Sequence, residues 1–264
     1  MSGWEAGISV VVTCHNYGHY LHRCLGSIEA QTLAPERVVV VDDASEDATS
    51  KVAATFSESL PDMVFARVDF RNANRTRNHG FDLTASEQVV FFDADNEMGP
   101  LFLERLSHSL STDPSAAFAY CDRINVLEGD AESLPEPPGH WQSQPFDASA
   151  LKRANYIDMA SLVRRGSFPG FDEALPMYQD WDLWLSIVGL GGKGIYVPEP
   201  LFRYRVHDNS LGHRTDPDPA AWRIRRKHRL GVFGAMPLVR DSLTAFRALR
   251  KLRKFVGGDA AGSR

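Results

Sequence analysis

The sequence predicts an α/β fold in which a mostly parallel sheet carries helices on both of its faces. Two β-branched runs, Ile8–Thr13 and Arg37–Val41, are typical of strands that are buried on both faces of a parallel sheet. Segments with helical spacing alternate with such runs, and this alternation implies right-handed βαβ crossovers. The chain has 264 residues, of which 43% are hydrophobic, so it is long and apolar enough to bury a substantial core.

The elements of the first half follow from local patterns. Leu21, Leu25 and Ile28 recur at spacings of four and three, which places them on one face of a helix after the first strand. The other predicted elements of this half are strands over Val64–Val68 and Val89–Phe92 and a helix over Asn74–Ala85, and the pattern changes after Phe118–Cys121. Strands and helices therefore alternate throughout the first half.

The second half has a less regular pattern. A Pro-rich stretch, Leu134–Gln144, predicts a mobile loop because proline excludes a regular helix and a central strand. Order is expected to return over Asn155–Ser167, followed by a helix over Asp180–Val188 and a strand over Gly194–Val197.

Charge is unevenly distributed along the chain. The whole chain carries 29 Lys and Arg against 34 Asp and Glu, which gives a formal charge of −5. From Trp222 to Arg264 there are 12 basic and two acidic residues, so this tail carries +10 and the preceding 221 residues carry −15. The charged fraction of 24% is ordinary, and together with the apolar fraction it excludes global disorder.

The cysteines and the N-terminus bear on the cellular compartment. Cys14, Cys24 and Cys121 are odd in number and lie in or beside apolar segments, which predicts reduced, buried thiols. The N-terminus lacks a positive n-region, and no apolar stretch approaches the roughly 20 residues needed to span a bilayer. The chain is therefore expected to be cytoplasmic.

Polar side chains follow three of the predicted strands. The segment Thr13–Tyr17 follows the first strand, Asp42 and Asp43 follow the second, and Asp93 and Asp95 follow the fourth. Ligands of parallel sheets bind beyond the carboxyl ends of the strands, so these side chains should converge on one crevice. Asp93 and Asp95 share a face of an extended backbone, where two carboxylates repel unless a cation such as Mg²⁺ or Mn²⁺ lies between them. An ordinary acidic turn is the alternative, since D-x-D by itself is frequent.

Two common nucleotide-binding motifs are absent from the sequence. The loop after the first strand lacks G-x-G-x-x-G, and the chain contains no G-x-x-x-x-G-K-[ST], which disfavours a Rossmann dinucleotide site and a P-loop. Asp42 and Asp43 must therefore contact a ligand in another way, or serve as capping residues for the backbone that follows.

Six segments of the chain share their order and spacing with a known family. They are VVVTCHNYGHYLHRCLGSIEAQT, VVVVDDASEDAT, TRNHGFDLTAS, VVFFDADN, YQDWDLW and YRVHDNSL, and they cover the chain from about Ile8 to Leu211. This pattern resembles the family 2 glycosyltransferases with the GT-A fold, a Rossmann-like α/β fold. The resemblance implies a nucleotide-sugar-binding half over residues 1–121 and an acceptor-binding and catalytic half of the same domain over residues 122–215. Beyond it, the charge pattern predicts a basic helical tail over residues 216–264.

The resemblance implies nucleotide-binding roles for residues of the first half. The residues that match the family's nucleotide-contacting loop, its acidic pair near the base and its Arg-Asn pair are Thr13, His15, Asn16, Tyr17, Asp42, Asp43, Arg77 and Asn78. One member of the acidic pair is expected to bond the nucleotide base.

The resemblance also implies a metal site and a catalytic base. Asp93 is expected to approach the ribose and to lie at the metal site, where Asp95 holds the ion on the diphosphate. His207 matches a histidine that in some relatives completes the metal shell or touches the diphosphate, and a surface histidine is the alternative. Asp180 matches the general base.

These residues together imply a reaction. A sugar would pass from a nucleoside-diphosphate sugar, most often a UDP-sugar in this family, to a hydroxyl acceptor that is a saccharide, a glycolipid or a small molecule. Mn²⁺ or Mg²⁺ would neutralise the leaving diphosphate, and Asp180 would take the acceptor proton in a single displacement that inverts the anomeric centre.

Two other functions are alternatives to this reaction. No nucleic-acid partner is expected. A nucleotidyltransferase is one alternative, but that class normally has a Gly-rich phosphate loop, which TCHNYGHY lacks. A non-catalytic nucleotide-sugar-binding or membrane-adaptor protein is another, and the presence of both Asp95 and Asp180 disfavours it.

Aromatic residues near the expected base are candidates for acceptor contacts. Trp184 is expected in the core, whereas Trp181 is expected at the edge of the acceptor site together with Gln179, which stands where the family usually has Glu. His140 and Trp141 in the Pro-rich stretch either close over the acceptor or belong to a spacer.

The basic tail contains a predicted amphipathic helix from Pro237 to about Val256. Its apolar residues recur every third position and basic residues largely surround them; the apolar ones are Leu243, Phe246, Leu249 and Leu252. Such a helix predicts peripheral contact with an anionic membrane, where a lipid-linked acceptor would be presented. Packing on the acidic body of the protein, or on a second subunit, is the alternative.

Overall fold

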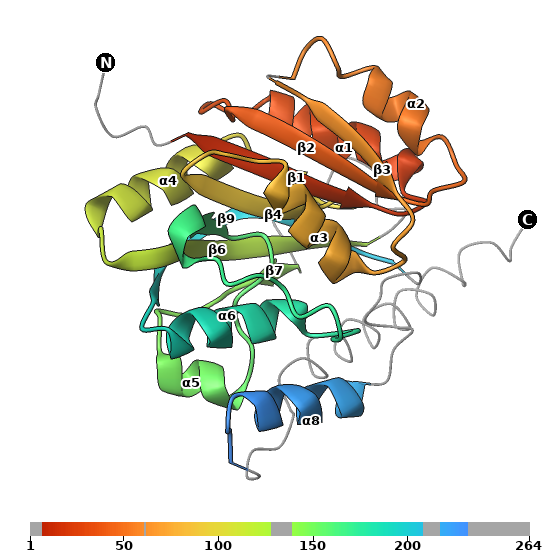
Figure 1. Ribbon diagram of the computed structural model, residues 1–264. Coiled ribbons are helices and arrows are strands. Elements are labelled where there is room, and N and C mark those ends of the chain that lie inside the picture. Colours follow the sequence, from red (N-terminus) through yellow and green to blue (C-terminus); the bar gives the residue numbers. More distant parts are fainter. Residues whose placement is uncertain (1–6, 61, 128–138, 208–216, 232–264) are drawn as a thin grey trace, which may run out of the picture.

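The computed structural model describes residues 7–60, 62–127, 139–207 and 217–231. Its strands form one sheet in the order β3-β2-β1-β4-β8-β6-β9-β5, with β7 paired to β6 at the side (Figure 1). The strands are β1 (Ile8–Cys14), β2 (Arg37–Asp43), β3 (Val64–Val68), β4 (Gln88–Asp93), β5 (Glu97–Met98), β6 (Ala116–Leu127), β7 (His140–Trp141), β8 (Leu162–Arg164) and β9 (Lys193–Val206). The helices are α1 (Gly18–Glu29), α2 (Thr49–Ala54), α3 (Ala73–Asp82), α4 (Phe102–Thr112), α5 (Ala148–Arg153), the 3₁₀ turn η1 (Arg165–Ser167), α6 (Gln179–Gly189) and α8 (Pro217–Lys227).

The first four strands of the chain are parallel, as predicted. Val10 on β1 lies opposite Val38 on β2 and Val90 on β4, and β3 continues the parallel set beyond β2. Successive side chains of a strand point to opposite faces, so Val10 and Val11 enter different cores. This explains the unbroken β-branched runs, because both faces of these strands are buried.

Helices cover both faces of the sheet, which confirms the predicted fold class. On one face, Leu25 of α1 and Phe102 of α4 pack in the same core as Val10. On the other face, Trp184 of α6 packs in the same core as Val11, and α3 lies against this face as well (Figure 1).

Gly80 allows α3 to approach β1 closely. A Cβ atom at this position would lie 2.3 Å from Val11 Cγ1 and 3.1 Å from Val41 Cγ2. These separations are shorter than van der Waals contact, so a larger residue here would push the helix away from the sheet.

The second half of the sheet is mixed. β8 joins antiparallel between β4 and β6, whereas β6 and β9 form a long parallel pair. The predicted strand over Gly194–Val197 is therefore only the first part of β9, which continues to Val206. Its far end pairs antiparallel with β5, where Glu97 lies opposite Arg203. This pairing brings the end of β9 beside the loop that follows β4.

The prediction of a mobile loop over Leu134–Gln144 needs a correction. His140 and Trp141 form β7, which pairs antiparallel with Ile124 and Arg123 of β6. Proline is excluded from central strands, but it can precede a short strand at the side of a sheet. The predicted loop therefore extended too far toward Gln144. The remainder of the stretch before Gly139 lies outside the described residues.

The start of the basic tail forms a helix that packs on the body. Ala221 and Ile224 of α8 are buried in the core that contains Trp184. Lys227 Nζ lies 2.7 Å from Asp182 Oδ2 and His228 Nε2 lies 2.7 Å from Asp182 Oδ1, so a buried carboxylate of α6 anchors the end of α8. The helix predicted from Pro237 to about Val256 lies outside the described residues. Within the part of the chain that the structure describes, every helix is too short or too polar to cross a bilayer.

Candidate active site

The D-x-D segment lies at the carboxyl end of β4, where three elements meet. Asp93 Oδ1 accepts a hydrogen bond of 2.7 Å from Arg77 Nη2 on α3 and one of 3.3 Å from Thr13 Oγ1 on β1. The Asp93 side chain keeps 34% of its surface exposed, whereas Arg77 is only 5% exposed. The geometry therefore brings Thr13, Arg77 and Asp93 together, as the sequence predicted for a crevice at this sheet edge.

Asp95 and His207 are brought together from opposite ends of the fold. The Asp95 Oδ2 and His207 Nε2 atoms lie 2.9 Å apart, and His207 is only 3% exposed. The ring of Tyr17 meets the imidazole edge-on at a centroid distance of 5.4 Å. The alternative of a surface histidine is therefore wrong, because His207 is buried against Asp95 and Tyr17.

Arg205 holds the end of β9 against the D-x-D loop. Its backbone N–H donates to Asn96 Oδ1 at 3.0 Å, and its Nη2 donates to Glu97 Oε1 at 2.5 Å. Its guanidinium also lies 5.0 Å from the centroid of the Tyr20 ring. These contacts explain how a histidine 112 positions away from Asp95 reaches it.

The donor atoms at Asp95 and His207 suit a divalent cation. Burial raises the pKa of Asp95, and the negative charge of Asp93 raises it further. A cation between these groups would relieve that repulsion, and carboxylate oxygen with imidazole nitrogen is a donor set that Mn²⁺ accepts. In the described ranges no group of three or more His, Cys, Asp and Glu side chains is arranged to hold a metal ion. Asp95 and His207 supply two donor atoms, which fits an ion whose other ligands would be substrate phosphates and water.

The loops after β1 and β2 are bonded to each other. The Asn16 backbone N–H donates to Ser45 Oγ, and the Glu46 N–H donates to Asn16 Oδ1, both at 2.8 Å. His15 Nδ1 lies 2.5 Å from the carbonyl oxygen of Asp43. Asn16 has a left-handed backbone with φ of 58°, which asparagine tolerates better than most residues. His15 and Asn16 thus form part of one rigid rim beside Thr13.

Asp43 is already fully engaged by the protein. Its carboxylate accepts from the backbone N–H groups of Phe70, Arg71 and Asn72 and from Thr76 Oγ1, at 2.7–2.9 Å. Burial raises its pKa, but these four hydrogen bonds together outweigh burial and hold the pKa below its ordinary value. Four donors saturate the lone pairs of a carboxylate, so the structure favours a capping role for Asp43 over the predicted contact with the nucleotide.

Asp42 is engaged in a similar way. It is completely buried, and it accepts from the Ser45 N–H and from Arg67 Nη1, each at 3.0 Å. A base contact at this position would need the carboxylate to be reachable. The capping alternative therefore fits Asp42 as well.

Asp180 lies in the first turn of α6, after a residue with a left-handed backbone. Tyr178 caps the helix with φ of 58° and ψ of 34°, a conformation that costs a bulky residue about 1–3 kcal/mol. Asp180 Oδ1 accepts from the Trp181 N–H at 2.8 Å, and Oδ2 accepts from Asn155 Nδ2 at 2.7 Å. One oxygen of Asp180 is therefore bonded to the first turn of its own helix and the other to the segment that follows α5.

The pKa of Asp180 is raised to about 6. Burial is the largest cause and the negative charge of Asp158 is the next, while the Trp181 N–H and the cations Arg77 and Arg123 act in the opposite direction. A carboxylate with a pKa near neutrality is suited to general base catalysis. Arg77 thus bonds Asp93 directly, and its charge also acts on Asp180.

The residues predicted for the acceptor site have different surroundings. Gln179 is half-buried beside Asp180, and its Nε2 donates to the Pro176 carbonyl at 3.3 Å. Trp181 is only 4% exposed, and its Nε1 donates to the Leu151 carbonyl at 2.7 Å. The prediction that Trp181 edges the acceptor site is corrected, because its indole fills the core between α5 and α6. Trp184 is fully buried, as expected for a core residue.

Three residues near Asp180 were not singled out from the sequence. Arg123 forms an ion pair with Asp158, and its guanidinium lies 4.2 Å from the Tyr204 ring centroid and 4.7 Å from that of Trp141. Asn155 bonds Asp180 directly. Arg123 lies on β6, whereas Asn155 and Asp158 lie in the connection between α5 and β8, and none of them belongs to a motif, so no local signal in the sequence could have found them.

The mostly parallel sheet with helices on both faces is the architecture of the GT-A fold. The model of the family described as Glycosyl transferase family 2 matches residues 9–169. The chain belongs to glycosyl transferase family 2.

Similar proteins agree with this assignment. The uncharacterized glycosyltransferase alr2836 of Nostoc is 29% identical over 215 residues, which cover 76% of this chain and 65% of the relative. The chain spans slightly less than two thirds of the length of the first curated relatives it matches, at 65% and 66%.

Two solved structures show the same fold. Residues 1–349 of Staphylococcus aureus TarS, in complex with UDP-GlcNAc, superpose with a TM-score of 0.68 at 15% identity, covering 84% of this chain and 65% of that one. The mannosyltransferase PcManGT of Pyrobaculum calidifontis, in complex with GDP-Man and Mn²⁺, has a TM-score of 0.60 at 20% identity, covering 85% and 61%. The predicted GT-A fold is confirmed.

Proposed function

We propose that this chain is an inverting, metal-dependent glycosyltransferase that moves a sugar from a nucleoside-diphosphate sugar to a hydroxyl acceptor. The observation that carries the proposal is the hydrogen bond of 2.7 Å from Arg77 to Asp93 at the carboxyl edge of the sheet, where Thr13 also meets Asp93. Asp93 is proposed to face the donor in this crevice, and Asp180, whose raised pKa is partly lowered by the charge of the same Arg77, is proposed to border it.

The donor nucleotide is assigned to the rim formed by the loops after β1 and β4. Thr13, Tyr17 and Asp93 converge there, and the linked loops of His15 and Asn16 stiffen the rim. A preorganised rim lowers the entropy lost on binding a flexible diphosphate. A UDP-sugar is the proposed donor, and the binding of UDP-GlcNAc by the TarS fragment is consistent with this choice.

A divalent metal ion is assigned to Asp95 and His207, with Asp93 beside them. The carboxylate oxygen Oδ2 of Asp95 and the imidazole nitrogen Nε2 of His207 lie 2.9 Å apart, and Mn²⁺ accepts both kinds of donor. When bound, the ion would neutralise the charge of the leaving diphosphate. The PcManGT complex contains Mn²⁺, which agrees with this assignment.

Asp180 is the proposed general base. Its carboxylate takes the proton of the acceptor hydroxyl as that oxygen forms a bond to the anomeric carbon of the sugar. The bond between the anomeric carbon and the diphosphate oxygen breaks in the same step, and the nucleoside diphosphate leaves with the electron pair. A single displacement from the opposite side inverts the configuration. Gln179 beside Asp180 is proposed to contact the acceptor.

The experiment that tests the proposal measures donor binding by calorimetry and donor hydrolysis with a panel of nucleotide sugars. With Mn²⁺ present, the wild-type chain should bind UDP and slowly hydrolyse one donor, whereas Asp95→Ala should lose the Mn²⁺-dependent part of the UDP affinity. Glu58→Ala removes an exposed carboxylate after α2 and serves as the control.

Two outcomes would contradict this proposal. Undiminished Mn²⁺-dependent UDP affinity in Asp95→Ala would remove the metal assignment. Tight binding of a nucleotide sugar without hydrolysis or transfer to any acceptor would favour the non-catalytic binding alternative.

A further inference from the structure

The two faces of α8 have opposite character. The inner face contributes Ala220, Ala221 and Ile224 to the core, each no more than 3% exposed. The outer face carries Trp222, which is 61% exposed, and two exposed arginines, Arg223 and Arg226. Arg229, just after the helix, is exposed as well. Because Asp182 anchors Lys227 and His228 at the end of α8, the outer face is presented on a fixed helix.

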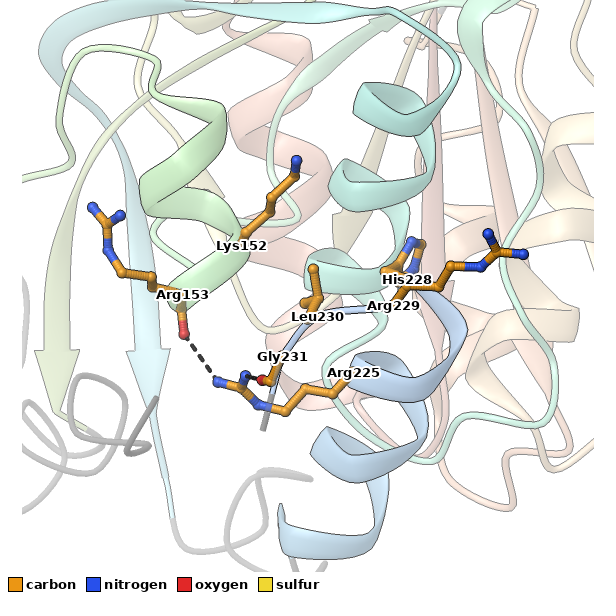
Figure 2. A pocket seen from close by; sticks show the side chains of 7 residues that line it. All are labelled: Lys152, Arg153, Arg225, His228, Arg229, Leu230 and Gly231. Carbon is orange, nitrogen blue, oxygen red and sulfur yellow. Dashed lines mark hydrogen bonds between the residues drawn. The ribbon is translucent and has the colours of Figure 1, made fainter. Parts of the chain in front are cut away.

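A basic hollow of about 260 Å³ lies where α8 and α5 end. Its cationic lining comes from Lys152 and Arg153 on α5 and from Arg225, His228 and Arg229. Figure 2 shows the Arg225 guanidinium between the main chains of Arg153 and Gly231, to whose carbonyls it donates at 3.4 and 3.1 Å. In the same view the side chains of Arg153 and Arg229 extend outward on opposite sides.

The charge of this region is strongly positive. In the described part of the chain, Lys152, Arg153, Arg226 and Arg229 form no ion pair. Cations are also favoured at helix C-termini, but each of the two helix ends contributes only about −0.5 charge. The Lys and Arg residues that line the hollow therefore outweigh the helix dipoles several times over, so this region keeps a net positive charge.

We propose that the outer face of α8, together with the basic end of α5, is a docking surface for the phosphate headgroups of an anionic membrane. An exposed tryptophan flanked by arginines is the combination that lies at a bilayer interface, where the ring enters the headgroup region and the cations meet the phosphates. The body of the chain is acidic, so the positive face also orients the protein on such a surface. This surface is independent of the proposed transfer reaction.

The test is cosedimentation of the full chain with vesicles of phosphatidylcholine, with and without phosphatidylglycerol, at low and high salt. Wild-type protein should bind only the anionic vesicles and be released by salt. The triple variant R223Q/R226Q/R229Q should bind about 10²-fold more weakly, because each Lys or Arg near an anionic leaflet contributes about 1 kcal/mol, or about fivefold. Trp222→Ser should weaken binding about tenfold through lost burial of the ring.

A matched triple variant controls for loss of charge alone. K51Q/R75Q/R105Q removes three exposed cations from α2, α3 and α4 and should bind as the wild type does. Equal losses in both triples, or wild-type binding in R223Q/R226Q/R229Q, would overturn the proposal. A third outcome would assign the surface to a soluble phosphate compound instead. In that outcome the amount of bound protein does not depend on anionic lipid, and inorganic phosphate releases the protein from the vesicles more effectively than chloride of equal ionic strength.

A different observation concerns the residue that holds Asp180. Asn155 Nδ2 donates to Asp180 Oδ2 at 2.7 Å, while its Oδ1 accepts from the Ile157 N–H at 3.2 Å. The backbone N–H can only pair with the amide oxygen, so the amide nitrogen is forced toward the carboxylate. Asn155 takes one lone pair of Asp180 Oδ2 and the Trp181 N–H takes one of Oδ1, and each oxygen has a second lone pair that can accept from an acceptor hydroxyl.

We infer that Asn155 is a positioning residue that holds Asp180 in the orientation needed to take the acceptor proton; this inference depends on the proposed role of Asp180. The charged groups that face Asp180 are Asp158 from the segment after Asn155, Arg77 from α3 and Arg123 from β6. A hydrogen bond to the ionised carboxylate favours the form that acts as a base. Asn155 therefore orients the Asp180 carboxylate, and its hydrogen bond offsets part of the rise in the pKa of Asp180 that the negative charge of Asp158 causes.

The test compares Asn155→Ala and Asn155→Asp by their pH–rate profiles. Asn155→Ala should lower kcat about tenfold or more with an unchanged KM for the donor, because a hydrogen bond to a charged group is lost. Asn155→Asp keeps the acceptor for the Ile157 N–H but adds a negative charge, so the rising limb of kcat should move about one pH unit higher. Tyr156→Phe, which loses the hydroxyl that accepts from the Asp147 N–H, loosens the same segment and should leave the profile in place.

The variant Asp180→Asn distinguishes a failure of the positioning role of Asn155 from a failure of the base role of Asp180. If it loses transfer while both Asn155 variants keep wild-type kcat and pH profile, the positioning role is wrong and the base assignment stands. If Asp180→Asn itself retains transfer, the proposed base is wrong.

Discussion

The two halves of the sheet hold their functional groups in different ways. In the first half, loops that follow neighbouring parallel strands bond to each other, as Asn16 does to Ser45 and Glu46. In the second half, Asp180 depends on Asn155, which precedes it by 25 positions on a separate segment. A binding rim can therefore be built from adjacent strand ends, whereas a base with a shifted pKa needs groups from several elements.

The same residue type has opposite properties in the two halves. Asp43 accepts four hydrogen bonds, which hold its pKa below the ordinary value and leave it a structural anion. Asp180 accepts two, and burial raises its pKa to about 6. The pKa of a buried carboxylate thus depends on whether its hydrogen bonds outweigh burial, as they do for Asp43 and do not for Asp180.

The largest expected effect tests whether the second half carries the chemistry. Asp180→Asn should lower kcat by roughly 10²–10⁴-fold while donor binding is retained, because only the proton acceptor is removed. Initial rates and calorimetry on the same samples measure both. Asp182→Asn is the control, since Asp182 is buried against Lys227 and His228 and should affect stability rather than turnover. Loss of turnover in Asp182→Asn with near wild-type turnover in Asp180→Asn would reverse the assignment.

The next effect concerns packing beside the base. Trp181→Ala should lower the free energy of unfolding by about 3–5 kcal/mol, because the indole is 4% exposed and its removal leaves a large cavity. Urea denaturation followed by circular dichroism measures the loss. Unchanged stability with a raised KM for the acceptor would restore the predicted acceptor-edge role.

A smaller effect tests the close packing of the first half. Gly80→Ala should lower the free energy of unfolding by about 1–3 kcal/mol, since the new Cβ would meet Val11 Cγ1 at 2.3 Å. Gly26→Ala is the matched control in α1, where a Cβ would meet nothing within 4 Å and should raise stability by about 0.4–1 kcal/mol. Equal changes in the two variants would show that α3 can move away from β1 freely.

The smallest effect is the dependence on pH. As a base, Asp180 must be ionised, so kcat should rise with pH and reach half its plateau near pH 6. The raised pKa means that the folded state holds the proton more tightly than the unfolded state, so this group favours folding at low pH and loses that contribution as pH rises through 6. Asp180→Asn should therefore be the more stable protein at neutral pH, which thermal unfolding across pH would reveal. A flat rate profile between pH 5 and pH 7 would contradict the assignment.

The sequence by itself determined the architecture of the first half and the edge at which the site lies. Apolar runs predict β1, β2 and β4 because strands buried on both faces leave an unbroken apolar signature, whereas β3 is a half-exposed edge strand. The polar residues that follow them, such as Thr13 and Asp93, then predict a crevice because parallel strands end at one edge. These inferences need only the local chain, and the motif order extended them to His207 and Asp180 through resemblance.

Only the tertiary structure decided what each polar side chain touches. It saturated Asp43 with donors from the turn before α3, buried Trp181 against α5, and brought Asn155 to Asp180. The spacing of Trp181 and Asp180 along the chain is the same whether an indole faces a sugar or the core. Local periodicity reports which face of an element a residue occupies, but the neighbour on that face comes from an element distant in sequence, and that neighbour sets the burial, charge and hydrogen bonds from which a role follows.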